Sequence, residues 1–181
     1  MSSEINMIRS RRFFLMGMSA LICGAPGAMA TEANDAKEAF LKSSFETGIP
    51  MSKVLWLTKN LKPQVKKILK HAYPALRVRY WQNGTRTAWV LDEIGKYKPI
   101  TVGIVVQDGA IERLKVLTYR ESHGWEVRHD FFTRQFIGAR LPKPHKLDRK
   151  VDGISGATLS VRALKKLAIL ALFLDQKVQK Q

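Results

Sequence analysis

The chain has 181 residues and one cysteine, and its 31 lysine and arginine residues against 15 acidic residues give a formal net charge of +16. This length suits one ordinary domain with a hydrophobic core and some additional segments. Such a charge attracts anions, including nucleotides, anionic lipid surfaces and acidic proteins, although a solvated cationic surface that aids solubility has the same composition. The basic residues are scattered and form no stripe interleaved with aromatic residues, so we expect no nucleic-acid partner.

The first thirty residues have the pattern of an export signal. Ser10-Arg11-Arg12-Phe13-Phe14-Leu15 opens an apolar run to Cys23, and Ala28-Met29-Ala30 provides a cleavage pattern. The run is too short for a stable membrane span, and the paired arginines resemble a twin-arginine signal. An ordinary Sec signal or a lipoprotein signal at Cys23 are the alternatives, the second disfavoured by the bulky Ile22. We place cleavage after Ala30, with retention of residues 1–30 as an anchor as the alternative. We expect the protein to be periplasmic or extracytoplasmic, either free or peripheral to the inner membrane.

Cleavage after Ala30 leaves a mature chain without cysteine. Such a chain has no disulfide, no thiolate metal site and no cysteine nucleophile. No set of histidines or carboxylates has metal-ligand spacing either. We therefore expect no metal site.

Two stretches near the start of the mature chain have helical spacing. They cover residues 34–47 and 60–72, and the second has one apolar face and one lysine face. The apolar segment from Met51 to Leu57 lies between them, and its type is uncertain. We assign residues 31–75 to an N-terminal helical segment and residues 76–181 to the main domain.

The main domain begins with strand patterns. Residues 76–82 and 87–91 are rich in β-branched and aromatic residues, with the turn signal Asn83-Gly84 between them. Residues 101–107 and 110–119 form a second predicted hairpin around Asp108-Gly109, a pair suited to a two-residue turn.

The rest of the chain is predicted to be mainly helix and loop. The phenylalanines between 131 and 136 indicate a short helix, and two prolines keep residues 140–150 irregular. A long amphipathic helix is predicted from about Ala157 to Lys177. The fold class is therefore α+β, a single domain in which helices pack on a twisted, mainly antiparallel sheet.

The heptapeptide Asp152-Gly153-Ile154-Ser155-Gly156-Ala157-Thr158 stands directly before this long helix. A helix N-terminus presents unpaired N–H groups and the positive end of the helix dipole, so it suits a phosphate. Gly156 and Ala157 allow close approach to the backbone, Ser155 is the predicted N-cap, and Thr158 places a hydroxyl in the first turn. The alternative is a loop that binds no ligand and only caps the helix; that alternative accounts for Ser155 but not for the rest of the heptapeptide.

Residues 152–160, DGISGATLS, resemble the flavinylation motif of the FMN-binding domain family. This family includes flavin-bearing subunits of the sodium-pumping quinone reductase and of Rnf-type complexes, and stand-alone exported flavoproteins. Residues 98–103 with the following hairpin resemble its sheet core. Residues 119–126 resemble its Glu-x-x-Gly segment, which lies near the flavin ring. No transmembrane anchor follows the signal, in contrast to the pump subunits.

The resemblance implies that Thr158 carries FMN covalently through a phosphoester. A separate Mg²⁺-dependent FMN transferase would install it from FAD, with Asp152 as part of what the transferase recognises. The other cofactor-binding residues that the resemblance implies are Ser155, Gly156, Ala157 and Leu159 at the motif, and Glu121, His123, Gly124 and Trp125 near the ring. Trp125 could equally be a core tryptophan, and His123 an ordinary surface or core histidine. Glu121 is expected to position the backbone or the ring edge rather than to act as an acid.

Taken together, these patterns predict an exported flavoprotein with one covalent FMN that passes electrons between membrane or soluble redox partners. No catalytic residue of its own is predicted, and whether the protein is an enzyme stays open. Two other hypotheses are a flavin-dependent reductase with its own small substrate, and a non-flavinylated cationic binding module.

Overall fold

The computed structural model describes residues 26–180, with side chains from residue 31 onward. The predicted arginine pair, the apolar run and Cys23 lie outside these residues. The predicted cleavage pattern, residues 28–30, falls within the first helix, α1 (Pro26–Lys42).

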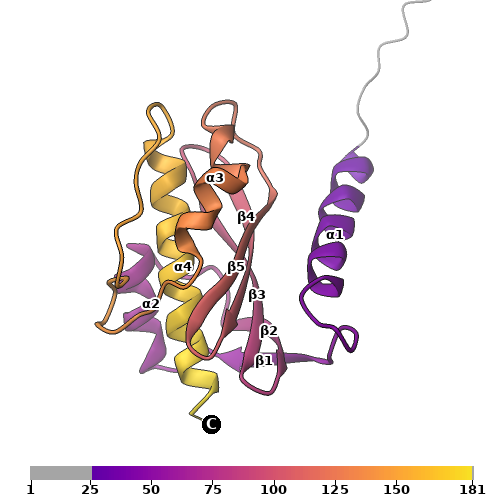
Figure 1. The fold of residues 1–181 in the computed structure, drawn as a ribbon, viewed down its shortest axis with the longest axis vertical. Helices are drawn as coiled ribbons and strands as arrows, with labels where there is room; N and C mark the ends of the chain where they lie inside the picture. The colour runs from indigo at the N-terminus through magenta and orange to yellow at the C-terminus, as the bar shows by residue number, and fades with distance from the viewer. Residues whose placement is uncertain (1–25, 181) are drawn as a thin grey trace, which may run out of the picture.

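Five strands form one antiparallel sheet in which spatial order follows chain order. They are β1 (Ser52–Trp56), β2 (Arg77–Asn83), β3 (Arg86–Ile94), β4 (Pro99–Gln107) and β5 (Ala110–Thr118). Each strand therefore pairs only with its neighbours along the chain, and β1 and β5 are the edges (Figure 1). This arrangement confirms the α+β prediction.

The two predicted hairpins are present. Asp108 and Gly109 both have positive φ, 50° and 70°, as a two-residue primed turn requires. The first hairpin turns one residue later than predicted, because Asn83 still pairs with Arg86 and leaves Gly84-Thr85 as the loop.

One face of the sheet carries the main core. The helix α4 (Thr158–Val178) packs across β3 and β4, and α2 (Leu61–Leu69) lies beside α4 on the same face (Figure 1). Leu164, Leu167 and Leu170 of α4 are completely buried. Burial of a leucine side chain contributes about 2 kcal/mol, so α4 is fixed to the sheet by its apolar face.

The opposite face of the sheet is covered by α1, which stands apart from the other helices in Figure 1. Phe40 lies against Gly103 of β4, where an added Cβ would come within 2.7 Å of the ring. Glycine is needed here because the aromatic ring occupies the space of a side chain.

The helix ends differ from those predicted. The first helix covers 26–42 instead of 34–47, and the second ends at Leu69, where Lys70 turns into the left-handed region. The uncertain segment 51–57 contains β1, which pairs with β2. Residues 31–75 therefore contribute a strand to the same sheet, and α2 to the same core, as residues 76–181.

The segment after β5 forms three short turns of helix: η1 (Trp125–Arg128), α3 (Asp130–Thr133) and η2 (Arg134–Phe136). Phe132 and Phe136 are buried there with their rings 5.7 Å apart. Within residues 26–180, no helix is both long enough and apolar enough to cross a membrane.

Candidate functional site

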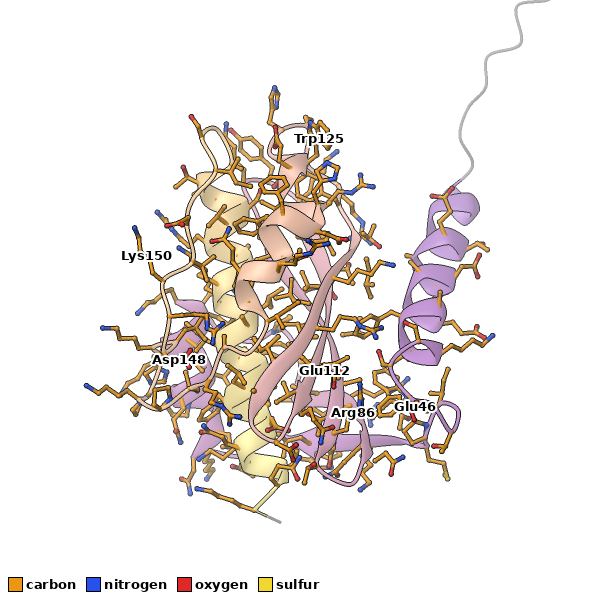
Figure 2. The ribbon with its side chains drawn as sticks, viewed as in Figure 1. Glu46, Arg86, Glu112, Trp125, Asp148 and Lys150 are labelled. Atoms are coloured by element: carbon orange, nitrogen blue, oxygen red, sulfur yellow. The ribbon has the colours of Figure 1, made fainter. Side chains whose placement is uncertain are left out.

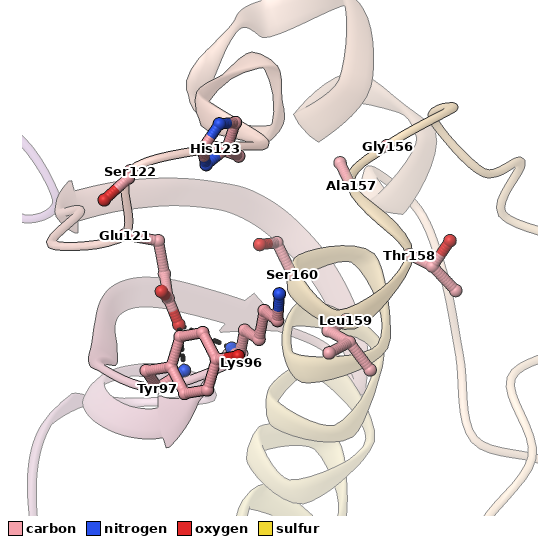
Figure 3. A pocket seen from close by; sticks show the side chains of 10 residues that line it. All are labelled: Lys96, Tyr97, Glu121, Ser122, His123, Gly156, Ala157, Thr158, Leu159 and Ser160. Carbon is pink, nitrogen blue, oxygen red and sulfur yellow. Dashed lines mark hydrogen bonds between the residues drawn. The ribbon is translucent and has the colours of Figure 1, made fainter.

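A hollow of about 580 Å³ lies where three segments far apart in the sequence meet (Figure 3). The segments are the β3–β4 loop, the loop after β5 and the first turn of α4. Its volume is typical of small-molecule sites. The hollow is lined by Lys96, Tyr97, Glu121, Ser122, His123, Gly156, Ala157, Thr158, Leu159 and Ser160.

Glu121 holds the first two segments together. Its Oε1 accepts three backbone N–H bonds, from Lys96 at 2.5 Å, Tyr97 at 2.7 Å and Lys98 at 2.9 Å. These N–H groups, with that of Lys98 foremost, lower the pKa of Glu121 below its ordinary value of 4.5. The carboxylate therefore holds the backbone of the β3–β4 loop in place, which agrees with the positioning role expected for Glu121. Because it stays ionised, it is unsuited to act as an acid.

Tyr119 connects the loop after β5 to α4. Its hydroxyl donates to the backbone carbonyl of His123 at 2.6 Å and lies 2.8 Å from Ser160 Oγ, which is then the donor to Tyr119. Burial raises the pKa of Tyr119. The hydroxyl thus stays protonated and fixes His123 relative to the first turn of α4.

Gly124 allows this contact to be close. Its φ is +83°, and an added Cβ would lie 3.0 Å from both Ala157 Cβ and the Tyr119 hydroxyl. Ala157 is buried in this contact. The loop after β5 and the start of α4 can approach this closely because Gly124 and Ala157, which face each other there, are both small.

The start of α4 has no side-chain cap. The N-cap residue is Ala157, and the predicted capping role of Ser155 is wrong. The reason is a turn closed by the bond from Ala157 N–H to Ile154 O at 3.0 Å, in which Gly156 has φ +80° and Ser155 is exposed two positions before the cap. The first intrahelical bond is donated by Val161 to Ala157 O, so the N–H groups of residues 158–160 have no carbonyl one turn earlier.

Thr158 is exposed in this uncapped turn. Figure 3 shows its side chain pointing away from Ser160 and Lys96. On that side lies a second hollow of about 230 Å³, lined by Gly153, Thr158, Val161, Arg162 and Lys165. Thr158 therefore lines both hollows, and the smaller one is also lined by the cations Arg162 and Lys165.

Lys96 is a residue that the sequence did not single out. In Figure 3 its ammonium group points past Tyr97 toward Ser160, and it lies 4.8 Å from the centre of the Tyr97 ring. The one carboxylate among the lining residues, that of Glu121, is occupied by the three N–H groups. The larger hollow is thus lined by one ammonium group and one ionised carboxylate, and Oε1 of that carboxylate is engaged by backbone N–H groups. Ser122 and Ser160 also line it; both lie within the two segments that resemble the family, but neither was predicted as a site residue.

Two other predicted residues, Trp125 and Asp152, do not line the hollow. Trp125 lies at the surface and is 51% exposed, which contradicts the core alternative (Figure 2). Its ring packs edge-on against His129 with centroids 4.9 Å apart. Asp152 is exposed, forms an ion pair with Lys150 at 3.3 Å, and donates its backbone N–H to Gln135 Oε1. His123, by contrast, does line the hollow, and it is the aromatic residue among the lining residues of the loop after β5.

No group of three or more metal-ligating side chains occurs among the residues that the structure describes. The chemical resources of the site are instead free N–H groups, one exposed hydroxyl and several cations. Such a set suits an anion with one covalent or hydrogen-bonded anchor.

Residues 95–172 match the FMN-binding domain, the family predicted from the motif. The match includes the β3–β4 loop, the segment with Glu121 and the start of α4, so all three parts of the hollow lie within it. A search of curated proteins found no match.

Proposed function

Because residues 95–172 form an FMN-binding domain, we propose that this protein is an exported electron carrier with one FMN bound as a phosphoester to Thr158. The observation that carries the proposal is the position of Thr158. This exposed residue of an uncapped helix turn lines both the hollow of about 580 Å³ and the smaller one of about 230 Å³. Export is proposed from the signal pattern of the first thirty residues.

The described residues fit FMN in both charge and shape. The N–H groups of the first turn suit a phosphate, and the cations Arg162 and Lys165 line the smaller hollow together with Thr158. Gly156 has open space where a side chain would stand. The larger hollow, with Lys96 and His123 in its lining, is where we place the ring system. When bound, the isoalloxazine supplies reversible redox chemistry.

The proposal includes a partner enzyme for the attachment, as the resemblance to the family implies. We propose a Mg²⁺-dependent FMN transferase that uses FAD. The bond between Thr158 Oγ1 and the FMN phosphorus forms, the pyrophosphate bond of FAD breaks, AMP leaves, and the hydroxyl proton passes to the transferase. Asp152 is exposed six residues before Thr158 and is available for recognition by that enzyme.

The chain's own residues then orient the group rather than perform chemistry. Glu121 and Tyr119 fix the two loops against α4, so the hollow has a defined shape before any ligand enters. Lys96 adds positive charge, which favours a more negatively charged ligand and raises the potential of a flavin held beside it. Electrons would come from, and pass to, membrane or soluble redox partners.

The test is to produce the protein with an FMN transferase, denature it and measure its mass and visible absorbance. We expect a mass increase of one FMN less one water and yellow colour that stays with the chain. Thr158→Ala should remove both. Ser155→Ala, which deletes a neighbouring hydroxyl, should retain both. Colour that washes away on denaturation, or an unchanged mass increase in Thr158→Ala, would refute the covalent assignment.

A further inference from the structure

The stretch of chain from β1 into β3 has an unusual charge distribution. Residues 47–91 contain nine lysines and arginines and no aspartate or glutamate. Five of the lysines lie on or next to α2 and are exposed; they are Lys59, Lys62, Lys66, Lys67 and Lys70. We refer to these five as the α2 lysine face. Among residues 26–180, no acidic side chain forms an ion pair with any of them, so their charge is directed to solvent.

An apolar groove of about 520 Å³ adjoins the α2 lysine face. Lys62 and Lys66, one helical turn apart, line one side of it. The remaining lining is mostly apolar and comes from Leu57, Pro63, Ala72, Tyr73, Pro74, Ala75 and Leu76. Leu76 is 62% exposed. The groove therefore combines two cations with carbon-rich walls that are open to solvent.

The helix α2, which carries these lysines, is packed against the core. Val65, Ile68 and Leu69 of α2 are buried. Just beyond the helix, His71 Nε2 lies 2.9 Å from Glu93 Oε2, and Lys166 of α4 donates to the other oxygen of Glu93 at 2.7 Å. The lysine side chains thus project from a helix whose position is determined by the rest of the fold.

We propose that the groove and the α2 lysine face are a docking site for an anionic phospholipid bilayer. Lys62 and Lys66 would contact headgroup phosphates while the groove accepts lipid carbons. Lysines also place their aliphatic stems along apolar surface while their charges reach an aqueous or headgroup layer. Each basic residue near an anionic membrane surface changes partitioning about fivefold.

The apolar walls favour a lipid over a nucleic acid. Proteins bind single-stranded nucleic acids by combining a positively charged groove with free aromatic faces on which the bases stack. The groove's own aromatic residue, Tyr73, is partly buried and packs against the core. The exposed ring nearby, that of Trp56, has the Arg77 guanidinium over it at 5.7 Å. An acyl chain needs no aromatic face, and the prolines and Leu76 provide suitable contact surface.

The docking site lies away from the hollow at Thr158. Figure 1 shows α2 beside the lower half of α4, whereas the N-terminus of α4 is at the upper end of the same helix. A bilayer bound at α2 would therefore leave the start of α4 accessible. The inference does not depend on the presence of flavin.

The experiment measures sedimentation of the full chain with vesicles of phosphatidylglycerol and phosphatidylethanolamine, compared with vesicles of phosphatidylcholine. We expect selective binding to the anionic vesicles that weakens as salt is added. Lys62→Glu together with Lys66→Glu should weaken partitioning at least about tenfold. The matched control is Lys143→Glu with Lys146→Glu, which makes the same charge change on the exposed 140–150 loop and should have a much smaller effect.

A second pair tests the groove itself. Leu76→Asp should weaken anionic vesicle binding, whereas Ile94→Asp, at a similarly exposed apolar residue elsewhere, should weaken it much less. Circular dichroism confirms that each variant is folded, and the N-terminal segment is identical in all of them. Equal loss in the two lysine pairs, equal binding to both vesicle types, or no vesicle binding by the folded protein would overturn the proposal. If the folded protein binds no vesicles but binds an acidic protein or a nucleic acid in a salt-sensitive way, the α2 lysine face is a binding site for that partner instead.

Discussion

Toward its C-terminal end α4 is buried, whereas its N-terminal end is open and polar. Every residue from 170 to 175 is buried, including Asp175, whose carboxylate accepts the Thr87 hydroxyl at 2.7 Å and the Gln179 amide at 3.1 Å. At the other end Thr158 and Leu159 are exposed and no side chain caps the helix. The comparison teaches that stability and access are separated along one helix. Because the buried end fixes α4, the open end can leave N–H groups and a hydroxyl available for a ligand.

The largest expected effect comes from the buried end. Leu170→Ala should lower the free energy of unfolding by about 3 kcal/mol, because it removes a fully buried side chain and leaves a cavity. Leu159→Ala, at a residue 38% exposed in the first turn, should cost less than about 1 kcal/mol. Urea unfolding measures both, and equal losses would contradict the division between the two ends.

The second-largest loss of stability is expected from the hydrogen bond between Thr87 and Asp175 at the buried end of α4. Asp175→Ala leaves the Thr87 hydroxyl without its buried acceptor, and we expect a loss of about 2 kcal/mol in the free energy of unfolding. Asp152→Ala removes an exposed carboxylate and should change stability by less than about 0.5 kcal/mol. If Asp152 contributes to recognition by the transferase, the same variant should carry less FMN when flavinylation is measured by mass.

The contact between Gly124 and Ala157, which joins the loop after β5 to the start of α4, should contribute less to stability than the buried contacts of the core. Gly124→Ala forces a side chain into a left-handed residue and against Ala157, so we expect a loss of about 1.5 kcal/mol. Gly153→Ala is the matched control, because its backbone is not left-handed and an added Cβ meets no atom within 4 Å. Thermal unfolding of the two variants compares them directly, and a Gly153 variant that is equally destabilised would argue against this packing.

Glu121 gives a pH-dependent prediction. Its hydrogen bonds with three N–H groups lower its pKa below 4.5, so its contribution is complete above that value and is lost as the pH falls through the lowered pKa. Glu121→Gln should cost about 1 kcal/mol at pH 7, allowing for solvent screening at this partly exposed position. The difference between wild type and variant should shrink below about pH 4. A difference independent of pH would indicate that the charge has no part in holding the loop.

The smallest effect is expected at Ser155. An N-cap serine contributes about 1 kcal/mol, but Ser155 caps no helix in this fold. Ser155→Ala should therefore change the unfolding free energy by less than about 0.5 kcal/mol. A loss of a full kilocalorie in chemical denaturation would restore the capping role that the sequence suggested.

The sequence by itself determined the features that depend on neighbouring residues. Asp108-Gly109 predicted its turn because both residues tolerate positive φ. The apolar spacing of residues 157–177 predicted α4, and the motif at its start identified the FMN-binding domain that the match over residues 95–172 confirms. These are local signals, readable from propensity and periodicity.

Only the tertiary structure decided what the site contains. Lys96 enters it because Glu121, 25 residues later, binds the backbone of its loop. Ser155 is not the cap because Gly156 turns the chain before Ala157, and β1 joins the sheet because β2 pairs with it. Contacts between residues distant in sequence depend on how the whole chain packs, and such packing overrides local preference wherever the local signal is weak.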